Sequence, residues 1–170
     1  VSSSAKSFRV TRDRTGRWFV SFAAIPEPIP APGTGEVVGV DRGVAVSVAL
    51  SSGEMTNAPT LRDSLKPRLL RLLRNLARAK KGSNRRGKVK VAIAKLKARE
   101  TDRRKDWVEK TSTDLARRFD VIGFEDLKIS NMTRSAKGTI EAPGKNVRQK
   151  AGLNRGILAN SWGQLVERLE

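Results

Sequence analysis

The chain has 170 residues, and its 35 Lys and Arg against 17 Asp and Glu give a net charge of +18. This length is sufficient for one domain with a core, and so large an excess of cations favours a polyanionic partner, above all nucleic acid. The chain contains no Cys and no His, which excludes disulfides, cysteine zinc sites and imidazole chemistry within it. Any bound metal would therefore have oxygen ligands, which favours Mg²⁺ or Mn²⁺. No apolar run reaches the length of a membrane span, and no signal peptide is visible.

The N-terminal part predicts a small β-hairpin followed by a linker. Residues 6–11 and 17–22 alternate like strands, residues 12–16 form a turn between them, and Trp18, Val20 and Phe22 fall on one face. Residues 26–35 have Pro at every second position from 26 to 32, which favours an extended chain. We therefore expect a β piece over residues 1–25, a linker over 26–35 and the main domain over 36–170.

The main domain is expected to begin with a meander. The run Val-Val-Gly-Val-Asp at 37–41 is apolar up to its acid, which is typical of a strand covered on both faces. A turn at Arg42-Gly43, a second strand over residues 44–50, a turn at 51–53 and a short strand over 54–57 follow.

A basic helical hairpin is expected over about residues 60–119. Leucines spaced by three or four residues from Leu61 to Leu76 predict a helix starting near Pro59, and Gly82-Ser83-Asn84 would end it. A second helix is expected from about 88 to 119. Residues 61–105 contain 18 basic and 3 acidic side chains, a local net charge of +15. Such a helical pair would repel itself unless it met an anionic partner; the alternative is a solvated, highly charged coiled coil.

The rest of the chain is expected to contain one strand, one loop and one helix. Residues 121–126 are again a short apolar strand that runs into acids, and residues 127–144 are polar and rich in turn residues, as in a mobile loop. A last helix is expected from about Asn154, with Leu158, Trp162, Leu165 and Leu169 on its apolar side. No capping residue ends that pattern before Glu170, which hints that the natural protein continues.

Two of the acids are candidates for a metal site. In each acid-ended strand the carboxylate stands two residues after a glycine and on the same face, Asp41 after Gly39 and Glu125 after Gly123. A face without side chains would let a substrate backbone approach. We therefore prefer Glu125 over Asp126 as the partner of Asp41. The alternative is that both are ordinary strand ends with solvated acids.

Four motifs in this order resemble the RuvC region of TnpB, the family of transposon-encoded, RNA-guided nucleases related to type V CRISPR effectors. They are Val-Gly-Val-Asp-Arg-Gly at 38–43, Ala-Lys-Lys-Gly-Ser-Asn-Arg-Arg at 79–86, Ile-Gly-Phe-Glu-Asp-Leu-Lys-Ile-Ser-Asn-Met at 122–132 and Leu-Asn-Arg-Gly-Ile-Leu-Ala-Asn-Ser-Trp-Gly at 153–163. The resemblance implies an α/β, ribonuclease-H-like (RuvC) core with an inserted basic helical hairpin, preceded by the end of a wedge-type barrel. It also implies a protein of the prokaryotic cytoplasm.

By this resemblance, Asp41 and Glu125 are the first two catalytic carboxylates and ligands of Mg²⁺ or Mn²⁺. The family's third carboxylate follows a zinc ribbon of CxxC pairs, and this chain has neither, so zinc belongs only to a segment not present here. The implied function is RNA-guided, metal-dependent cleavage of DNA, with a guide RNA and a target DNA as partners. The chain is expected to be a partial nuclease region that is inactive by itself.

Three further interpretations stay open. The chain could be a guide-RNA or DNA-binding module without catalysis, a basic helical RNA-binding protein of ribosomal type in which both acids are incidental, or a protein with a supporting role in transposition. The expected contacts to nucleic acid gather around the break between the two helices: Arg71, Arg74, Arg78, Lys80, Lys81, Arg85, Arg86 and Lys88.

Overall fold

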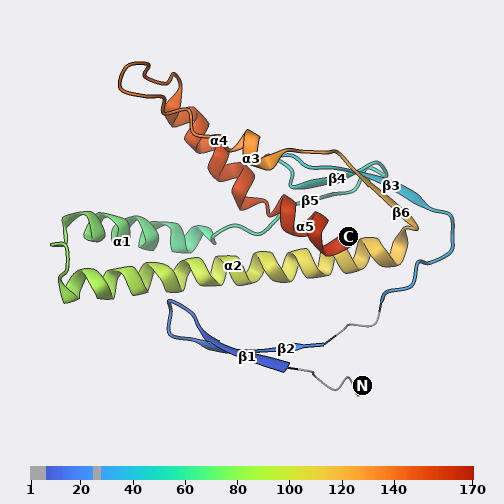
Figure 1. The fold of residues 1–170 in the computed structure, drawn as a ribbon, viewed down its shortest axis with the longest axis horizontal. Helices are drawn as coiled ribbons and strands as arrows, with labels where there is room; N and C mark the ends of the chain where they lie inside the picture. The colour runs from blue at the N-terminus through green and yellow to red at the C-terminus, as the bar shows by residue number, and fades with distance from the viewer. Residues whose placement is uncertain (1–6, 25–27) are drawn as a thin grey trace. The chain divides into compact units, whose positions relative to one another are not determined.

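The computed structural model describes residues 7–24 and 28–170 (Figure 1). It contains two compact units. Unit 1 joins the N-terminal residues up to Pro28 with Leu61–Arg103, and unit 2 joins Ile29–Thr60 with Arg104–Glu170. The long helix α2 (Asn84–Arg118) has its N-terminal part in unit 1 and its C-terminal part in unit 2.

Unit 1 begins with the expected hairpin. Strands β1 (Ser7–Arg12) and β2 (Trp18–Ala23) pair antiparallel, with Phe8 opposite Phe22 and Arg12 opposite Trp18. In the turn, the Asp13 carboxylate accepts hydrogen bonds from the Thr15 hydroxyl, the Thr15 backbone N–H and the Arg17 backbone N–H. The bond from the Thr15 hydroxyl is the first cause that holds the pKa of Asp13 well below its usual range. Lys6 lies outside the described residues.

The two helices expected over about residues 60–119 are present, with different starts from those expected. A 3-10 turn, η1 (Asp63–Leu65), leads into α1 (Lys66–Arg78), so the expected start near residue 59 is wrong. Helix α2 begins four residues before the expected position 88 because the Ser83 hydroxyl accepts the Arg86 backbone N–H at 3.2 Å and so caps it. The turn between the helices contains Gly82 at a φ of 81°, which favours glycine.

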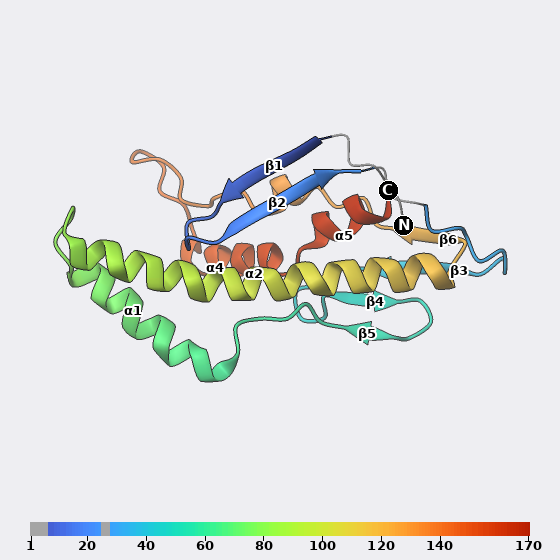
Figure 2. The same cartoon turned by 90° about the horizontal axis from the view of Figure 1, so that it is seen from below.

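Unit 2 is built on a four-stranded mixed sheet in the order β5-β4-β3-β6 (Figure 2). The strands are β3 (Val37–Asp41), β4 (Val48–Leu50), β5 (Met55–Thr56) and β6 (Val121–Phe124). Strand β3 pairs in parallel with β6, whereas β3–β4 and β4–β5 are antiparallel. The α/β class expected from the sequence is thereby confirmed.

The second meander strand is shorter than expected. Residues 44–47 are not strand, because the chain turns directly after β3: the Gly43 N–H donates to the Val46 carbonyl at 3.0 Å. A Cβ on Gly43 would lie 2.9 Å from that same oxygen, so this turn requires glycine. The expected strand over residues 44–50 is therefore reduced to Val48–Leu50.

The core of unit 2 covers one face of this sheet. Val38, Val40 and Val48 pack with Leu165 from the last helix, and Trp107 of α2 and Phe119 lie against this cluster. The exposure along β3 alternates strictly, with Val37, Gly39 and Asp41 exposed. The apolar run of this strand predicts burial on both faces, and within this chain that prediction is wrong, because the packing residues meet only the Val38–Val40 side.

The segment before β3 is tied to the residue before β6. The carboxylate of Asp120 accepts the backbone N–H groups of Gly33 at 2.7 Å and of Gly35 at 2.6 Å, and the Thr34 hydroxyl at 3.3 Å. The backbone bond from Gly33 is the leading cause that lowers the pKa of Asp120. This carboxylate therefore aligns the entries of the two parallel strands.

The C-terminal part differs from the expected loop and single helix. Short helix α3 (Ile129–Met132) and a β-bridge between Gly138 and Pro143 lie within the expected loop 127–144. Two helices, α4 (Val147–Ala159) and α5 (Trp162–Leu169), replace the helix expected from Asn154. They break at Ser161, whose φ is 56°, and the break separates exposed Leu158 from buried Leu165. None of the helices described is both long and apolar enough to cross a bilayer.

Candidate metal centre and nucleic-acid interface

The two candidate carboxylates follow from the register of β3 and β6. Val37 pairs with Val121, Gly39 with Gly123 and Val40 with Phe124. One step further along the same parallel register come Asp41 and Glu125, so both acids stand at the carboxyl ends of neighbouring strands. Both are exposed, and the alternation of the strands sets them on the face away from the core.

The two glycines make this face open immediately before the acids. Gly39 and Gly123 are direct partners in the register. A Cβ added to Gly39 would come no closer than 3.7 Å to Ser51, and one added to Gly123 would lie 3.8 Å from the Val38 carbonyl oxygen. Both positions therefore have room for a side chain. Because glycine places none there, the outer face of the two strands is open to the backbone of a long ligand.

A buried arginine lies behind the acids. Arg42, next to Asp41, is only 7% exposed, and its Nη2 donates a hydrogen bond to the backbone carbonyl of Glu125. Its guanidinium also lies over the Phe124 ring, 5.4 Å from the centroid. Burial lowers the pKa of Arg42, an effect opposed by the charges of Glu125, Asp126 and Asp41 in that order. Arg42 thus joins the end of β3 to the end of β6.

The turn after Asp41 is fixed from the far end of the chain. The Ser47 hydroxyl donates to the Asn160 side-chain carbonyl at 2.6 Å and accepts the Ala58 N–H at 2.8 Å. The Asn160 amide nitrogen donates to the Gly156 carbonyl at 3.1 Å and, at longer range, to the Gly43 carbonyl. Ser47 and Asn160 are both buried, so α4 and the turn share one satisfied polar network.

The donor set can be tested against a metal. Because the chain has no His or Cys, only acids can serve as charged ligands, and such oxygens suit Mg²⁺ or Mn²⁺. Within residues 7–24 and 28–170, no group of three or more acids is placed to hold an ion together. The pair Asp41 and Glu125 thus fits part of a metal site and would need further ligands from elsewhere.

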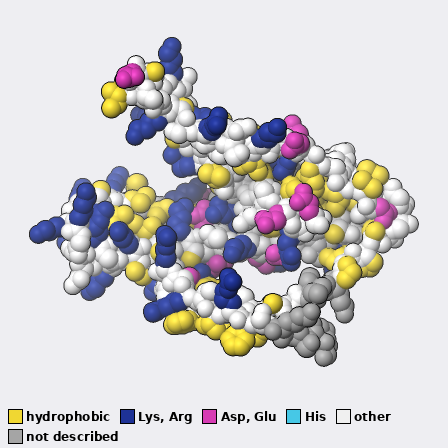
Figure 3. Space-filling view, viewed as in Figure 1, with side chains coloured by type: hydrophobic (Ala, Val, Ile, Leu, Met, Phe, Trp, Pro, Cys, Tyr) yellow, Lys and Arg dark blue, Asp and Glu magenta, His cyan; other side chains and the backbone are white. Residues whose placement is uncertain are grey.

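The basic hairpin presents most of its predicted contacts to solvent. Figure 3 shows Lys and Arg side chains crowded over the hairpin of α1 and α2. Arg86 is the exception: it is half-buried, and its Nη1 donates to the carbonyls of Leu76 at 2.6 Å and Ala79 at 3.1 Å. Arg86 therefore caps the end of α1 rather than standing free for a phosphate. The other seven predicted residues are exposed: Arg71, Arg74, Arg78, Lys80, Lys81, Arg85 and Lys88.

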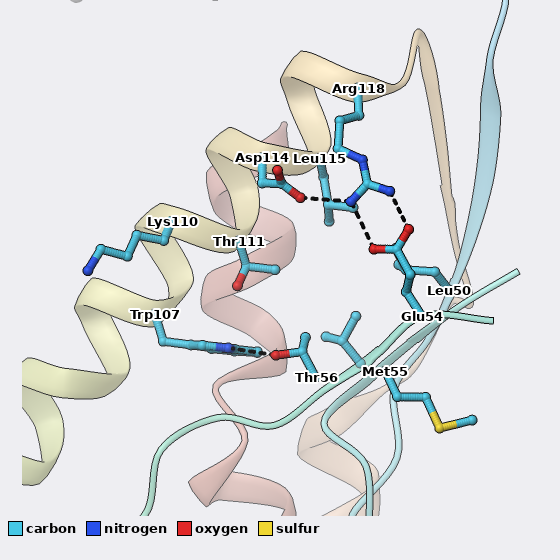
Figure 4. A pocket seen from close by; sticks show the side chains of 11 residues that line it. Leu50, Glu54, Met55, Thr56, Trp107, Lys110, Thr111, Asp114, Leu115 and Arg118 are labelled. Atoms are coloured by element: carbon cyan, nitrogen blue, oxygen red, sulfur yellow. Dashed lines mark hydrogen bonds and ion pairs between the residues drawn. The ribbon is translucent and has the colours of Figure 1, made fainter. Parts of the chain in front are cut away.

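A pocket of about 300 Å³ lies in unit 2 between β4–β5 and the C-terminal part of α2 (Figure 4). Five of its lining residues pair with one another: Arg118 pairs with both Glu54 and Asp114, and the Trp107 indole N–H donates to the Thr56 hydroxyl at 3.3 Å. The hydrogen bonds from Arg118 lower the pKa of Glu54. These paired groups act as structural ties, and neither candidate carboxylate lines the pocket.

Three contributors to these sites were missed by sequence reasoning. The period-2 pattern of β3 does place Arg42 on the Val38–Val40 side, so a core-facing arginine was visible as a signal. Asn160 and Asp120 gave no comparable signal, because their partners lie more than 80 positions away in the sequence.

Fold and site together define a mixed α/β protein with paired acids at the carboxyl ends of two parallel strands and a basic helical hairpin between those strands in the sequence. A family model described as "Probable transposase" (OrfB_IS605) matches residues 19–136, which is more than half of the chain. The chain therefore belongs to this family, and the resemblance to TnpB stated from the motifs is confirmed.

Two curated relatives agree with this assignment. The chain is 37% identical over 155 residues to the "Putative RNA-guided DNA endonuclease InsQ" of Escherichia coli (strain K12), covering 91% of this chain and 39% of the relative. It is 40% identical over 161 residues to a "Putative RNA-guided DNA endonuclease" of Streptomyces pristinaespiralis, covering 95% of this chain and 36% of the relative. The chain thus spans less than two-fifths of the length of these relatives.

Proposed function

We propose that this chain is the partial RuvC-type, ribonuclease-H-like nuclease region of an RNA-guided, metal-dependent DNA endonuclease. The observation that carries the proposal is the register of β3 and β6, which brings Asp41 and Glu125 to neighbouring strand ends on one open face. The names of the two relatives support the reaction and its partners, a guide RNA and a target DNA.

In this proposal Asp41 and Glu125 hold Mg²⁺ or Mn²⁺, which would activate water and stabilise the leaving oxygen of a phosphodiester. The open surface before the acids receives the DNA backbone, since Gly39 and Gly123 place no side chain there. Further carboxylates, including the third acid expected from the resemblance, come from outside this chain. The prokaryotic cytoplasm, the wedge-type hairpin over residues 1–25 and the linker over 26–35 belong to the same proposal.

The decisive experiment replaces Asp41 by Asn in a protein of the relatives' length that carries this chain. With guide RNA, target DNA and Mg²⁺, we expect cleavage to fall to background while DNA and RNA affinity stays within about twofold, because affinity derives mainly from Lys and Arg. Asp126→Asn, a neighbouring exposed acid, serves as the matched control and should keep most activity. Equal loss in both variants, or loss of binding in step with cleavage, would refute the assignment of Asp41.

A second candidate function is a guide-RNA or DNA-binding module without catalysis. It is favoured by one observation, the lack of a third acid grouped with Asp41 and Glu125 among the described residues. The same experiment separates the two functions: a binding module would show no Mg²⁺-dependent cleavage before any substitution, while its affinity for RNA would remain.

A further inference from the structure

The Arg42 side chain reaches across from the end of β3 to the end of β6 on the core side of the acids. Its Nη2 donates to the carbonyl of Glu125, which also accepts the Leu127 N–H at 2.9 Å. The Glu125 peptide is therefore held by two donors, one from its own strand end and one from the strand that carries Asp41.

The residues around Arg42 determine the orientation of its side chain. Arg42 is almost fully buried, and its Nε has no hydrogen-bond partner among the described residues. The guanidinium plane is supported by the Phe124 ring. A buried cation with an unused donor is costly, and the nearby charges of Glu125, Asp126 and Asp41 compensate part of that cost.

We propose that Arg42 is a positioning residue of the acid pair: by binding the Glu125 carbonyl it fixes where the Glu125 side chain leaves the end of β6 relative to Asp41. This inference rests on the proposed metal site and deepens it. Groups that orient metal ligands change metal affinity by roughly 10- to 100-fold when they are removed. The contact of Arg42 with the Phe124 ring does not by itself require a guanidinium, since an apolar side chain of similar length would also cover that ring.

The test uses Arg42→Met, which keeps the length and the contact with Phe124 but removes the donor, and Arg42→Lys, which keeps one donor. The matched control is Arg168→Met, because Arg168 is an exposed arginine whose Nε donates to Glu109 at 2.7 Å. Two quantities are measured for each variant: amide hydrogen exchange at residues 125–127 without metal, and Mn²⁺ affinity by electron paramagnetic resonance.

We expect Arg42→Met to raise exchange at residues 125–127 by at least about tenfold and to weaken Mn²⁺ binding by about tenfold. Exchange at Val38 and Val40 should stay unchanged, which a general loss of structure would not permit. Arg42→Lys should recover at least half of each loss on a logarithmic scale, and Arg168→Met should change neither quantity.

Unchanged exchange in Arg42→Met would overturn the proposal, and so would raised exchange with unchanged or tighter Mn²⁺ binding. Asp41→Asn and Glu125→Gln separate this failure from failure of the metal site itself. If neither of them weakens Mn²⁺ binding, the metal proposal is wrong, and the exchange measurement alone decides whether Arg42 positions Glu125.

Discussion

Asp120 shows how one half-buried carboxylate can organise two strands. It accepts the N–H groups of Gly33 and Gly35, both of which have a positive φ, and it precedes β6 directly. Its pKa is lowered in the folded chain, so its contribution to stability is present above the unfolded value near 3.9 and is lost as the pH falls through the folded value.

The first prediction concerns this pH dependence. Asp120→Asn should lower the melting temperature by a few degrees at pH 7, because an amide oxygen accepts the two N–H groups less strongly than a carboxylate. The gap between wild type and variant should narrow below about pH 4 and close in stronger acid. Thermal unfolding followed by circular dichroism from pH 2 to 7 measures it. Asp106→Asn, whose carboxylate pairs with Lys110, is the control; a gap independent of pH would contradict the prediction.

At the scale of single residues, the sequence allows the two candidate acids to be proposed but does not reveal the side chains around them. The shared spacing from glycine to acid was enough to select Asp41 and Glu125, because strand alternation is a local rule. The contacts of Arg42 and Asn160 depend on partners 83 and 113 positions away, and no local pattern encodes such distances. The capping contacts of Arg86 were not visible in the sequence for a related reason, since a capping arginine and a phosphate-binding arginine look alike there.

The polar network between α4 and the turn after β3 supports a second prediction. Asn160→Ala would leave the buried Ser47 hydroxyl without its acceptor, at a cost of about 1–3 kcal/mol of unfolding free energy. Ser47→Ala should cost a similar amount, since the Ala58 N–H and the Asn160 carbonyl both lose a partner.

Urea unfolding of both single variants and the double variant checks this network. The double variant should lose less than the sum of the single losses, by at least about 0.5 kcal/mol, because both substitutions break the same bond. Strict additivity would mean that Ser47 and Asn160 act separately. Asn154→Ala, on the same helix but bonded to the Thr133 carbonyl, is the control that should show no coupling with Ser47→Ala.

The third prediction concerns the salt dependence of nucleic-acid binding by the basic hairpin. Replacing Lys80, Lys81 and Arg85 by Gln should flatten the plot of log affinity against log salt by about 2–3, because each phosphate contact contributes roughly 0.7–0.9 to the slope. Arg86 is left in place because it caps α1. The loss should not depend on nucleic-acid sequence, since phosphate contacts carry none.

The matched control for the hairpin neutralises three exposed cations that already have acidic partners. These are Lys66 with Asp63, Lys110 with Asp106 and Arg168 with Glu109. Salt titrations of RNA and DNA binding should give this control nearly the slope of the wild type. If both triple variants lose the same slope, net charge alone determines affinity and the hairpin is not a specific interface.

The break between α4 and α5 marks the limit of sequence reasoning at the scale of elements. Spacings of three and four residues continue through Leu158, Trp162 and Leu165 as if one helix ran through them, yet Ser161 adopts a left-handed conformation. Tertiary packing determines this break, because it turns Trp162 and Leu165 into the core and leaves Leu158 exposed. The two helices α1 and α2, by contrast, follow local signals, namely the leucine spacing and the break at Gly82.

At the scale of the whole molecule, stability should be distributed unevenly. Every residue of β1 and β2 is exposed, including Phe8 at 69% and Trp18 at 66%, and two strands alone are marginally stable. Strand β3, in contrast, is paired on both sides and carries the buried residues Val38 and Val40.

The fourth prediction follows from this contrast. Amides of the β1–β2 pairs should exchange at least about 100-fold faster than the paired amides of β3, because opening the hairpin exposes little additional apolar surface. Native-state hydrogen exchange, measured by mass spectrometry or NMR, gives the exchange rates of the β1–β2 amides and of the β3 amides. Comparable protection would show that this isolated chain covers the apolar face of the hairpin, for instance by self-association, which dilution of the sample would then reverse.

The parallel pairing of β3 with β6 also determines when the two candidate acids can come together during translation. Asp41 and Glu125 are 84 positions apart, and neither strand end can meet its partner until the intervening helices have been translated. At roughly 5–20 residues per second, a ribosome needs about 4–17 s to make that stretch. In the later part of this interval the growing chain carries the basic residues up to Lys88 but not yet Glu125. Such a nascent chain would therefore present its phosphate-binding candidates seconds before both candidate carboxylates are present.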